Sequence, residues 1–329
     1  MTVGTELDMV VDELRDAERL LLITHENPDG DALGSILGMH GVLRLLGKDV
    51  LMFMPADQFP LPHEYKEMPF DGVITEPPPD MTDRLVVFLD CGNADRMPVD
   101  FIAESGARIV NIDHHHDNTR FGSVNLVVPH ASCTAEIVYG LSKQLGVEVT
   151  PPIAEALYVG LITDTGKFMY QNTTPEAHRM AAELIEIGVD VQAVYRRLYE
   201  NLPWARLQLL SRALNRISRY DDGRITVTHL RTEDFRETGS QEEDSEGIVD
   251  HIRSIEGTAV AVLVRELLAA DRAGRRKVSL RAPNGAVDVS RIAREMGGGG
   301  HRQAAGFSTA LPLPELLERL RREVGEQLD

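Results

Sequence analysis

The sequence predicts an α/β protein: a doubly wound, mostly parallel sheet in the N-terminal domain and a smaller α/β domain at the C-terminus. Short apolar runs typical of buried strands alternate with helical patterns up to about residue 188. These runs are LLLIT at 20–24, VLMFM at 50–54, LVVFLD at 85–90 and RIVNID at 108–113. After a helical stretch with no evident strand, the same alternation resumes beyond residue 223. We therefore expect a first domain at 1–190, a helical linker at 191–220 and a second domain at 221–329.

Helical patterns connect the predicted strands. In the first domain they cover 32–47, 133–146 and 151–163, and the last has proline in its first turn, where the helix tolerates it. In the second domain we expect strands at 224–230, 258–267 and 277–282, helices at 247–255 and 287–296, and a final helix from Pro314. Both domains thus alternate strand and helix.

Composition limits the class of protein. The 329 residues, 43% of them hydrophobic, suffice for two cores. A net charge of −18 argues against a protein that grips long nucleic acid by its backbone, because such binding needs basic surfaces. No apolar run approaches a membrane span and the first residues lack the layout of a secretory signal, so we expect a cytoplasmic protein. Cys91 and Cys133 lie in apolar stretches, where reduced thiols usually pack.

Acidic and imidazole side chains follow the predicted strands. They are His25, Asp29 and Asp31 after the first strand, Asp90 at the end of the third, and Asp113, His114 and His115 at the end of the fourth. In an open α/β sheet the loops beyond the carboxyl ends of the strands share one crevice, so these groups should converge. Adjacent carboxylates are costly unless strong cations lie between them. The pattern therefore predicts a site for one or more metal ions.

Each of these segments also has an ordinary structural interpretation. The His25–Asp31 segment, in which Asp31 opens the next helix, suits two ions, but a capped turn beside a surface histidine explains it equally well. Asp90 alone is more typical of a turn residue than of a ligand. Asp164 ends an apolar helical stretch, where either a cation or plain solvation offsets its conflict with the helix dipole. The histidine run at 114–116 favours the metal interpretation, because imidazoles bind manganese, iron, cobalt or zinc.

A second candidate site lies in the C-terminal domain. The run Gly297–Gly300 precedes His301 and Arg302. Successive glycines let backbone N–H groups close around an anion, and the adjacent side chains add charge-assisted hydrogen bonds to phosphate. Glycine runs are also linkers, but this one lies between a helical pattern and the apolar AAGF. Arg281, at the end of KVSLR, could reach the same loop.

Taken together, the motifs resemble a known family. HENPDGDALGS, VVFLDCGN, NIDHHHDN and GLITDTGKF, followed by KVSLRA and GGGGHRQAAGF, are similar to the DHH phosphoesterase family with its DHH-associated C-terminal domain. The resemblance covers nearly the whole chain. It extends to the NrnA-like branch, whose short, two-domain nanoRNases also act as 3′-phosphoadenosine-5′-phosphate (pAp) phosphatases.

The resemblance implies a site with two manganese ions and a role for each candidate residue. His25 and Asp29 would bind one ion, Asp31, His114 and Asp164 the other, and Asp90 would bridge both. His115 would contact phosphate, and Asp113 would orient a neighbouring imidazole. In the second domain the nucleotide would be held by Arg281, Gly298, Gly299, Gly300 and His301. His116 has no implied role.

The implied activity is metal-dependent hydrolysis of short oligoribonucleotides to mononucleotides and of pAp to AMP. The main alternative is a soluble cyclic di-AMP or pApA phosphodiesterase, since relatives with that chemistry use the same domain pair. A family II pyrophosphatase would lack the GGGGH loop, and a RecJ-like exonuclease would be longer. A non-catalytic nucleotide-binding module would lack ligands, whereas every predicted metal-binding position carries a competent side chain.

Expected partners follow from the same resemblance. They are a short RNA or small nucleotide as substrate and, because relatives are often dimers, a second copy of the chain. Long duplex nucleic acid and membranes are not expected. The basic DRAGRRK at 271–277 is either a solvated hairpin turn or an RNA contact.

Overall fold

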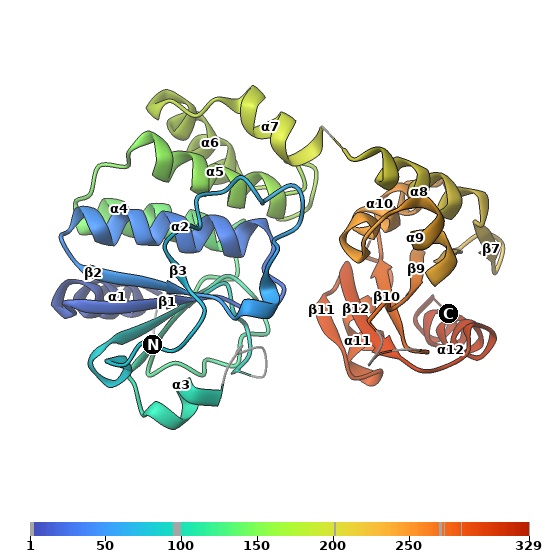
Figure 1. Ribbon diagram of the computed structural model, residues 1–329, viewed down its shortest axis with the longest axis horizontal. Helices are drawn as coiled ribbons and strands as arrows, with labels where there is room; N and C mark the ends of the chain where they lie inside the picture. The colour runs from blue at the N-terminus through green and yellow to red at the C-terminus, as the bar shows by residue number, and fades with distance from the viewer. Residues whose placement is uncertain are drawn as a thin grey trace. The chain divides into compact units, whose positions relative to one another are not determined.

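The computed structural model describes residues 3–94, 100–200, 202–269, 272, 274–283 and 285–328. The chain divides into two compact units, Met1–Glu200 and Asn201–Asp329 (Figure 1). The basic segment at 271–277 lies partly outside the described residues. Among the helices that are described, none is long and apolar enough to cross a membrane.

A parallel six-stranded sheet forms the centre of the first unit. Its strands are β1 (Arg19–Ile23), β2 (Asp49–Phe53), β3 (Val73–Ile74), β4 (Leu85–Leu89), β5 (Ile109–Asp113) and β6 (Val124–Val127). Their order is β3-β2-β1-β4-β5-β6, so the direction of winding reverses between β1 and β4. The four predicted strands are confirmed, while the short edge strands β3 and β6 were missed. A reversal of this kind opens a crevice at the carboxyl ends of β1 and β4.

Helices cover both faces of this sheet, which confirms the doubly wound prediction. One face carries α1 (Val3–Asp16), α2 (Gly30–Leu45), α4 (Thr134–Leu145) and α5 (Pro151–Asp164), and the other carries α3 (Asp100–Ser105) (Figure 1). Leu20 and Leu22 belong to the core under the first group, whereas Leu21 and Ile23 belong to the core under α3. The alternation of side chains along β1 thus fills both cores. The unit ends with α6 (Pro175–Ile187) and α7 (Val191–Tyr199).

Glycines allow α2 and α5 to approach closely. A Cβ added at Gly34 would lie 2.4 Å from the carbonyl oxygen of Ala156. One added at Gly160 would lie 2.9 Å from Oδ1 of Asp31. This close packing brings the first turn of α2, which carries Asp31, beside the last turns of α5, which end at Asp164.

A mixed six-stranded sheet forms the second unit. Its strands are β7 (Ser218–Tyr220), β8 (Ile225–Leu230), β9 (Val260–Glu266), β10 (Arg276–Arg281), β11 (Gly299–His301) and β12 (Ala304–Thr309), in the order β11-β12-β10-β9-β8-β7. Its helices are α8 (Trp204–Asn215), α9 (Thr232–Thr238), α10 (Ile248–Arg253), α11 (Val289–Glu295) and α12 (Leu313–Leu328). The strands and helices predicted for this part of the chain are confirmed, and α9 and β12 are additional.

Two segments of the second unit differ from expectation. Residues 218–220, predicted to continue a helical stretch, form β7 and pair with β8. Part of the predicted glycine loop is strand β11, which pairs with β12. A Cβ at Gly298 would lie 2.1 Å from the Gly306 carbonyl oxygen, and Gly300 has a φ of +132°. Glycine is therefore required here by the close packing of this hairpin, whatever else the run does.

Candidate metal centre

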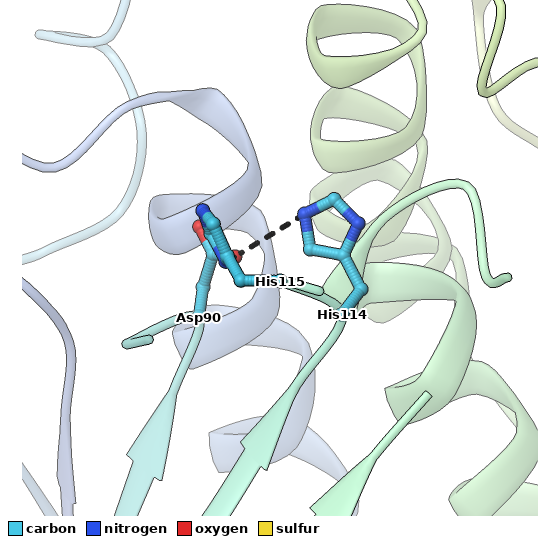
Figure 2. A group of neighbouring side chains, drawn as sticks. All are labelled: Asp90, His114 and His115. Carbon is cyan, nitrogen blue, oxygen red and sulfur yellow. Dashed lines mark ion pairs between the residues drawn. The ribbon is translucent and has the colours of Figure 1, made fainter. Parts of the chain in front are cut away.

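The predicted metal-binding residues of the first unit come together beyond the carboxyl ends of β1, β4 and β5. Figure 2 shows Asp90, His114 and His115 side by side. Three groups of described residues place ligand atoms within 4.8 Å of one another: Asp90, His114 and His115; His25, Asp29 and Asp90; and Asp31, His114 and Asp164. Asp90 and His114 each belong to two groups, so the three groups form one continuous cluster.

Asp90 lies at the centre of the cluster. Its residue is 2% exposed, and its Oδ2 lies 3.7 Å from Nε2 of His25. The other oxygen, Oδ1, lies 3.7 Å from Nε2 of His114 and 3.6 Å from Nδ1 of His115. The backbone of Asp90 has a φ of +60°, in the left-handed region that costs a non-glycine residue energy. The bent strand end thus directs the two carboxylate oxygens toward different neighbours.

His114 faces three carboxylates at similar distances. Its Nε2 lies 3.7 Å from Oδ1 of Asp90, 3.9 Å from Oδ2 of Asp31 and 3.7 Å from Oδ2 of Asp164. These separations are too long for hydrogen bonds. Atoms that share one ion, each about 2.1 Å from it, lie roughly 3 to 4 Å apart. The spacing fits a cation held between them.

His25 is fixed in one tautomer by the main chain. Its Nδ1 lies 2.7 Å from the carbonyl oxygen of Glu26, to which it donates a hydrogen bond. The lone pair of Nε2 is then available on the side that faces Asp90. Imidazoles that bind metals are commonly held in this way through their other ring nitrogen.

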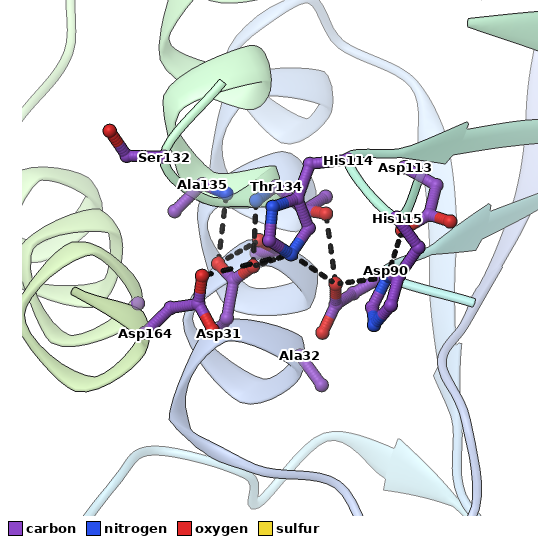
Figure 3. Close-up of polar contacts among 12 residues, drawn as sticks. Asp31, Ala32, Asp90, Asp113, His114, His115, Ser132, Thr134, Ala135 and Asp164 are labelled. Carbon is purple, nitrogen blue, oxygen red and sulfur yellow. Dashed lines mark hydrogen bonds and ion pairs between the residues drawn. The ribbon is translucent and has the colours of Figure 1, made fainter. Parts of the chain in front are cut away.

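Two aspartates of the His25–Asp31 segment cap helices. Asp29 caps α2, since its Oδ1 accepts hydrogen bonds from the N–H groups of Asp31 and Ala32 at 3.0 and 3.1 Å. Asp31 was expected to open this helix, but it lies in its first turn and caps α4 instead. Its two oxygens accept from the N–H groups of Thr134 and Ala135 at 2.6 and 2.9 Å (Figure 3). Both residues therefore cap a helix as well as belonging to the cluster, but the surface histidine expected beside the turn is wrong, because His25 is only 5% exposed.

Asp113 and Asn118 orient His115. Asp113 is fully buried, and its Oδ1 lies 2.7 Å from Nδ1 of His115. The amide of Asn118 donates to the other oxygen of Asp113 at 2.6 Å and to Oδ1 of Asn111 at 2.7 Å. Asn118 was assigned no role from the sequence, although it is the last residue of the motif NIDHHHDN and could have been noticed there. His116 is exposed and belongs to none of the three groups of described ligands.

Two of the residues predicted in the second unit, Arg281 and His301, lie in one cross-strand row of its sheet. Arg281 pairs with Ala304 across β10 and β12, and Ala304 pairs with His301 across β12 and β11. Residues directly opposite each other in a sheet point to the same face, so only a methyl group separates Arg281 from His301 in this row. Nε of Arg281 lies 3.4 Å from Oδ1 of Asp250. The Gly298–Gly300 run directly precedes His301 in the sequence, and Gly299 and Gly300 lie with it in the edge strand β11.

Comparison with known proteins identifies the family. Residues 19–161 match the N-terminal domain of the DHH family, and residues 223–328 match the DHHA1 domain. The bifunctional oligoribonuclease and PAP phosphatase NrnA of Thermus thermophilus is 36% identical over 98% of this chain and 94% of its own length. The chain belongs to the DHH family. The resemblance inferred from the motifs, including the NrnA-like branch, is confirmed.

Two further proteins match over similar lengths. NrnA of Bacillus subtilis is 27% identical over 88% of this chain and 89% of its own length. The crystal structure of an exopolyphosphatase-related protein from Bacteroides fragilis is 26% identical, covers 98% of this chain and 96% of its own, and superimposes with a TM-score of 0.87. The two-unit architecture is thus shared with this crystal structure over nearly the whole of both chains.

Burial is the largest single influence on the pKa values of the carboxylates in this centre of the DHH protein, and neighbouring charges add to it or oppose it. Burial raises the pKa of Asp31 well above its ordinary value, and the carboxylates of Asp90 and Asp164 raise it further. Burial, with Asp29 and Asp90, also raises the pKa of Asp164 to about 7 despite the neighbouring His114. Burial acts in the same direction on Asp90, but the imidazoles around it outweigh burial and hold its pKa below the ordinary value. A divalent cation would allow Asp31 and Asp164 to ionise at neutral pH.

Sequence reasoning missed two residues that support the cluster. The amide of Asn172 donates to Oδ2 of Asp164 at 2.9 Å and to the carbonyl oxygen of Ser132 at 2.8 Å. The hydroxyl of Thr134 donates to Oδ1 of Asp90 at 3.0 Å. Thr134 reaches Asp90 over 44 residues and Asn172 reaches Ser132 over 40, so no local pattern signals these two contacts.

Proposed function

We propose that this DHH protein is a manganese-dependent phosphoesterase with two metal ions, which hydrolyses short oligoribonucleotides to mononucleotides and pAp to AMP. The observation that carries the proposal is the position of Asp90, whose two oxygens face two separate groups of ligands. The names of its full-length relatives from Thermus thermophilus and Bacillus subtilis support the choice of substrates.

The donor set supports the assignment of the ions. We assign His25 and Asp29 to one ion, Asp31, His114 and Asp164 to the other, and Asp90 to both. Mixed imidazole and carboxylate ligands suit manganese among the divalent metals. Two such ions, when bound to these residues, would supply Lewis acidity and would lower the pKa of water for attack on a phosphoryl group.

His115 is the residue that we assign to the reacting phosphate. Asp113 holds His115 through Nδ1, which directs the opposite edge of the ring away from Asp113. We propose that this edge donates a hydrogen bond to a phosphate oxygen, where negative charge increases in the transition state. His115 would therefore contribute mainly to turnover.

Substrate binding is assigned to the second unit. Arg281, His301 and the Gly298–Gly300 run would hold the terminal nucleotide, so we expect His301→Ala to raise KM for pAp roughly tenfold and to change kcat less than about threefold. Steady-state kinetics with manganese measure both constants. His251→Ala, an exposed histidine on α10, is the control and should leave both unchanged. An unchanged KM with a lost kcat would contradict the binding role.

Metal affinity should rise with pH. Asp164 must lose its proton to bind an ion, and its pKa is about 7. For each pH unit below 7, the manganese affinity should therefore fall by up to about tenfold. In the metal-free protein the same raised pKa makes the fold more stable at low pH; this contribution is fully present below the ordinary pKa of 3.8 and is lost as the pH rises from there to about 7. Calorimetric titration with manganese at pH 6, 7 and 8, in two buffers of different ionisation enthalpy, measures affinity and proton release. Affinity that is independent of pH, with no proton released, would contradict the assignment of Asp164.

The substrate class is tested by product release from a defined panel. The panel holds pAp, RNAs of two to five nucleotides, a 24-nucleotide RNA, pApA, cyclic di-AMP and pyrophosphate, each with manganese and with chelator. Manganese-dependent cleavage of pAp and the shortest RNAs is expected. Preference for cyclic di-AMP or pApA would favour the signalling alternative, and no cleavage of any substrate would favour a nucleotide-binding module.

A further inference from the structure

Thr134, the first residue of α4, contacts two carboxylates of the metal centre through different atoms. Its backbone N–H donates to Oδ2 of Asp31 at 2.6 Å, and its hydroxyl donates to Oδ1 of Asp90 at 3.0 Å (Figure 3). Thr134 has no exposed surface, and Asp31 and Asp90 are only 1% and 2% exposed. One residue therefore joins a ligand from each of the two proposed ion sites.

The backbone half of this contact does not depend on the side chain. Asp31 accepts N–H groups from both Thr134 and Ala135 at the start of α4, where Cys133 makes no side-chain capping bond. A carboxylate is stabilised at a helix N-terminus because the first N–H groups have no helical partner and the dipole is positive there. Any residue except proline at position 134 would keep the first of these two bonds to Asp31.

The hydroxyl of Thr134 is a hydrogen-bond donor to Asp90, which also faces three imidazoles. The terminal torsion of an aspartate has a broad energy minimum, so its hydrogen-bond partners set its orientation. Oδ1, which accepts from Thr134, is the oxygen near His114, whereas Oδ2 faces His25. Without the Thr134 hydroxyl, Asp90 would lose the hydrogen bond that holds Oδ1 on the side of His114 and leaves Oδ2 on the side of His25.

We infer that Thr134 is a positioning residue that holds Asp90 in the orientation from which it binds both ions. The inference rests on the proposed function, since it concerns ions that Asp90 is proposed to share. Thr134 itself is not assigned any contact with substrate. Residues that orient metal ligands commonly contribute tenfold to hundredfold to metal affinity.

The test compares manganese binding by three forms of the full chain without substrate. Thr134→Val keeps the shape and the backbone N–H but lacks the hydroxyl, and should weaken manganese binding at least tenfold in calorimetric titration of the metal-free protein. Thr134→Ser restores the hydroxyl and should bind within about threefold of wild type. Thr226→Val is the matched control, because this buried hydroxyl bonds only with Thr258 in the described contacts of the second unit.

The outcomes separate this inference from the proposed function. Wild-type affinity in Thr134→Val would overturn the inference and leave the proposed function standing. A wild-type protein that binds no manganese would overturn both. Circular dichroism in chelator checks that the variant folds; if valine prevents folding, Thr134→Ala removes the hydroxyl without adding a methyl group, and the same loss of affinity is expected.

Discussion

Replacing Asp90 with asparagine is expected to lower kcat for pAp by at least about a thousandfold in the presence of manganese. The substitution removes the one charge that both proposed ions share, and with it the placement of the nucleophile. Asparagine tolerates the left-handed backbone of this position, where φ is +60°. The loss should therefore come from the missing carboxylate and not from backbone strain; alanine should be as inactive but less stable.

Steady-state rates and thermal unfolding in chelator measure these two effects separately. Asp222→Asn is a matched control, because Asp222 also has a positive φ, of +55°, and is exposed in the second unit. It should leave both the rate and the unfolding temperature near wild type. Retention of more than a tenth of the wild-type rate by Asp90→Asn or Asp90→Ala would refute the bridging role.

Removal of the His115 ring should separate turnover from metal binding. We expect His115→Ala to lower kcat roughly 100-fold to 1,000-fold, the range for loss of a group that assists at the reacting phosphate. The ring is held by Asp113 at 2.7 Å, so its orientation is set before substrate binds. Because His115 is proposed to contact phosphate and not to bind an ion, manganese affinity should change less than about threefold.

Rates and calorimetric titrations on the same preparation check this prediction. His116→Ala, at the exposed neighbouring histidine, should leave both quantities unchanged. A parallel loss of manganese affinity in His115→Ala would instead make His115 a metal ligand, in the group that contains Asp90 and His114.

The sheet of the first unit was predictable because its strands are buried on both faces. Strands of that kind are continuous apolar runs, as at Leu85–Leu89, and they can be recognised without knowledge of their neighbours. The convergence of Asp90 and His114 followed from the same reasoning, since both come directly after such strands. Strand β11 was not predictable in this way, because glycine has low strand propensity and the pairing with β12 depends on close packing.

The supporting contacts of the centre depend on the tertiary fold. Asp31 and the N-terminus of α4 are 103 residues apart in sequence and are brought together by the tertiary fold. A cap was expected near Asp31, but local patterns can assign a cap only to the next helix. The hydrogen bonds from Thr134 to Asp90 and from Asn172 to Ser132 span 44 and 40 residues, and partners brought together by packing leave no periodicity in the sequence.

The proposed sharing of Asp90 by two ions is tested by counting the manganese ions that the metal-free protein binds and by measuring whether they interact. Titration with manganese chloride, followed by electron paramagnetic resonance, should show two ions per chain with the spectrum of a magnetically coupled pair, and Asp90→Asn should lose that coupling. One ion per chain, or two that do not interact, would contradict the shared site at Asp90.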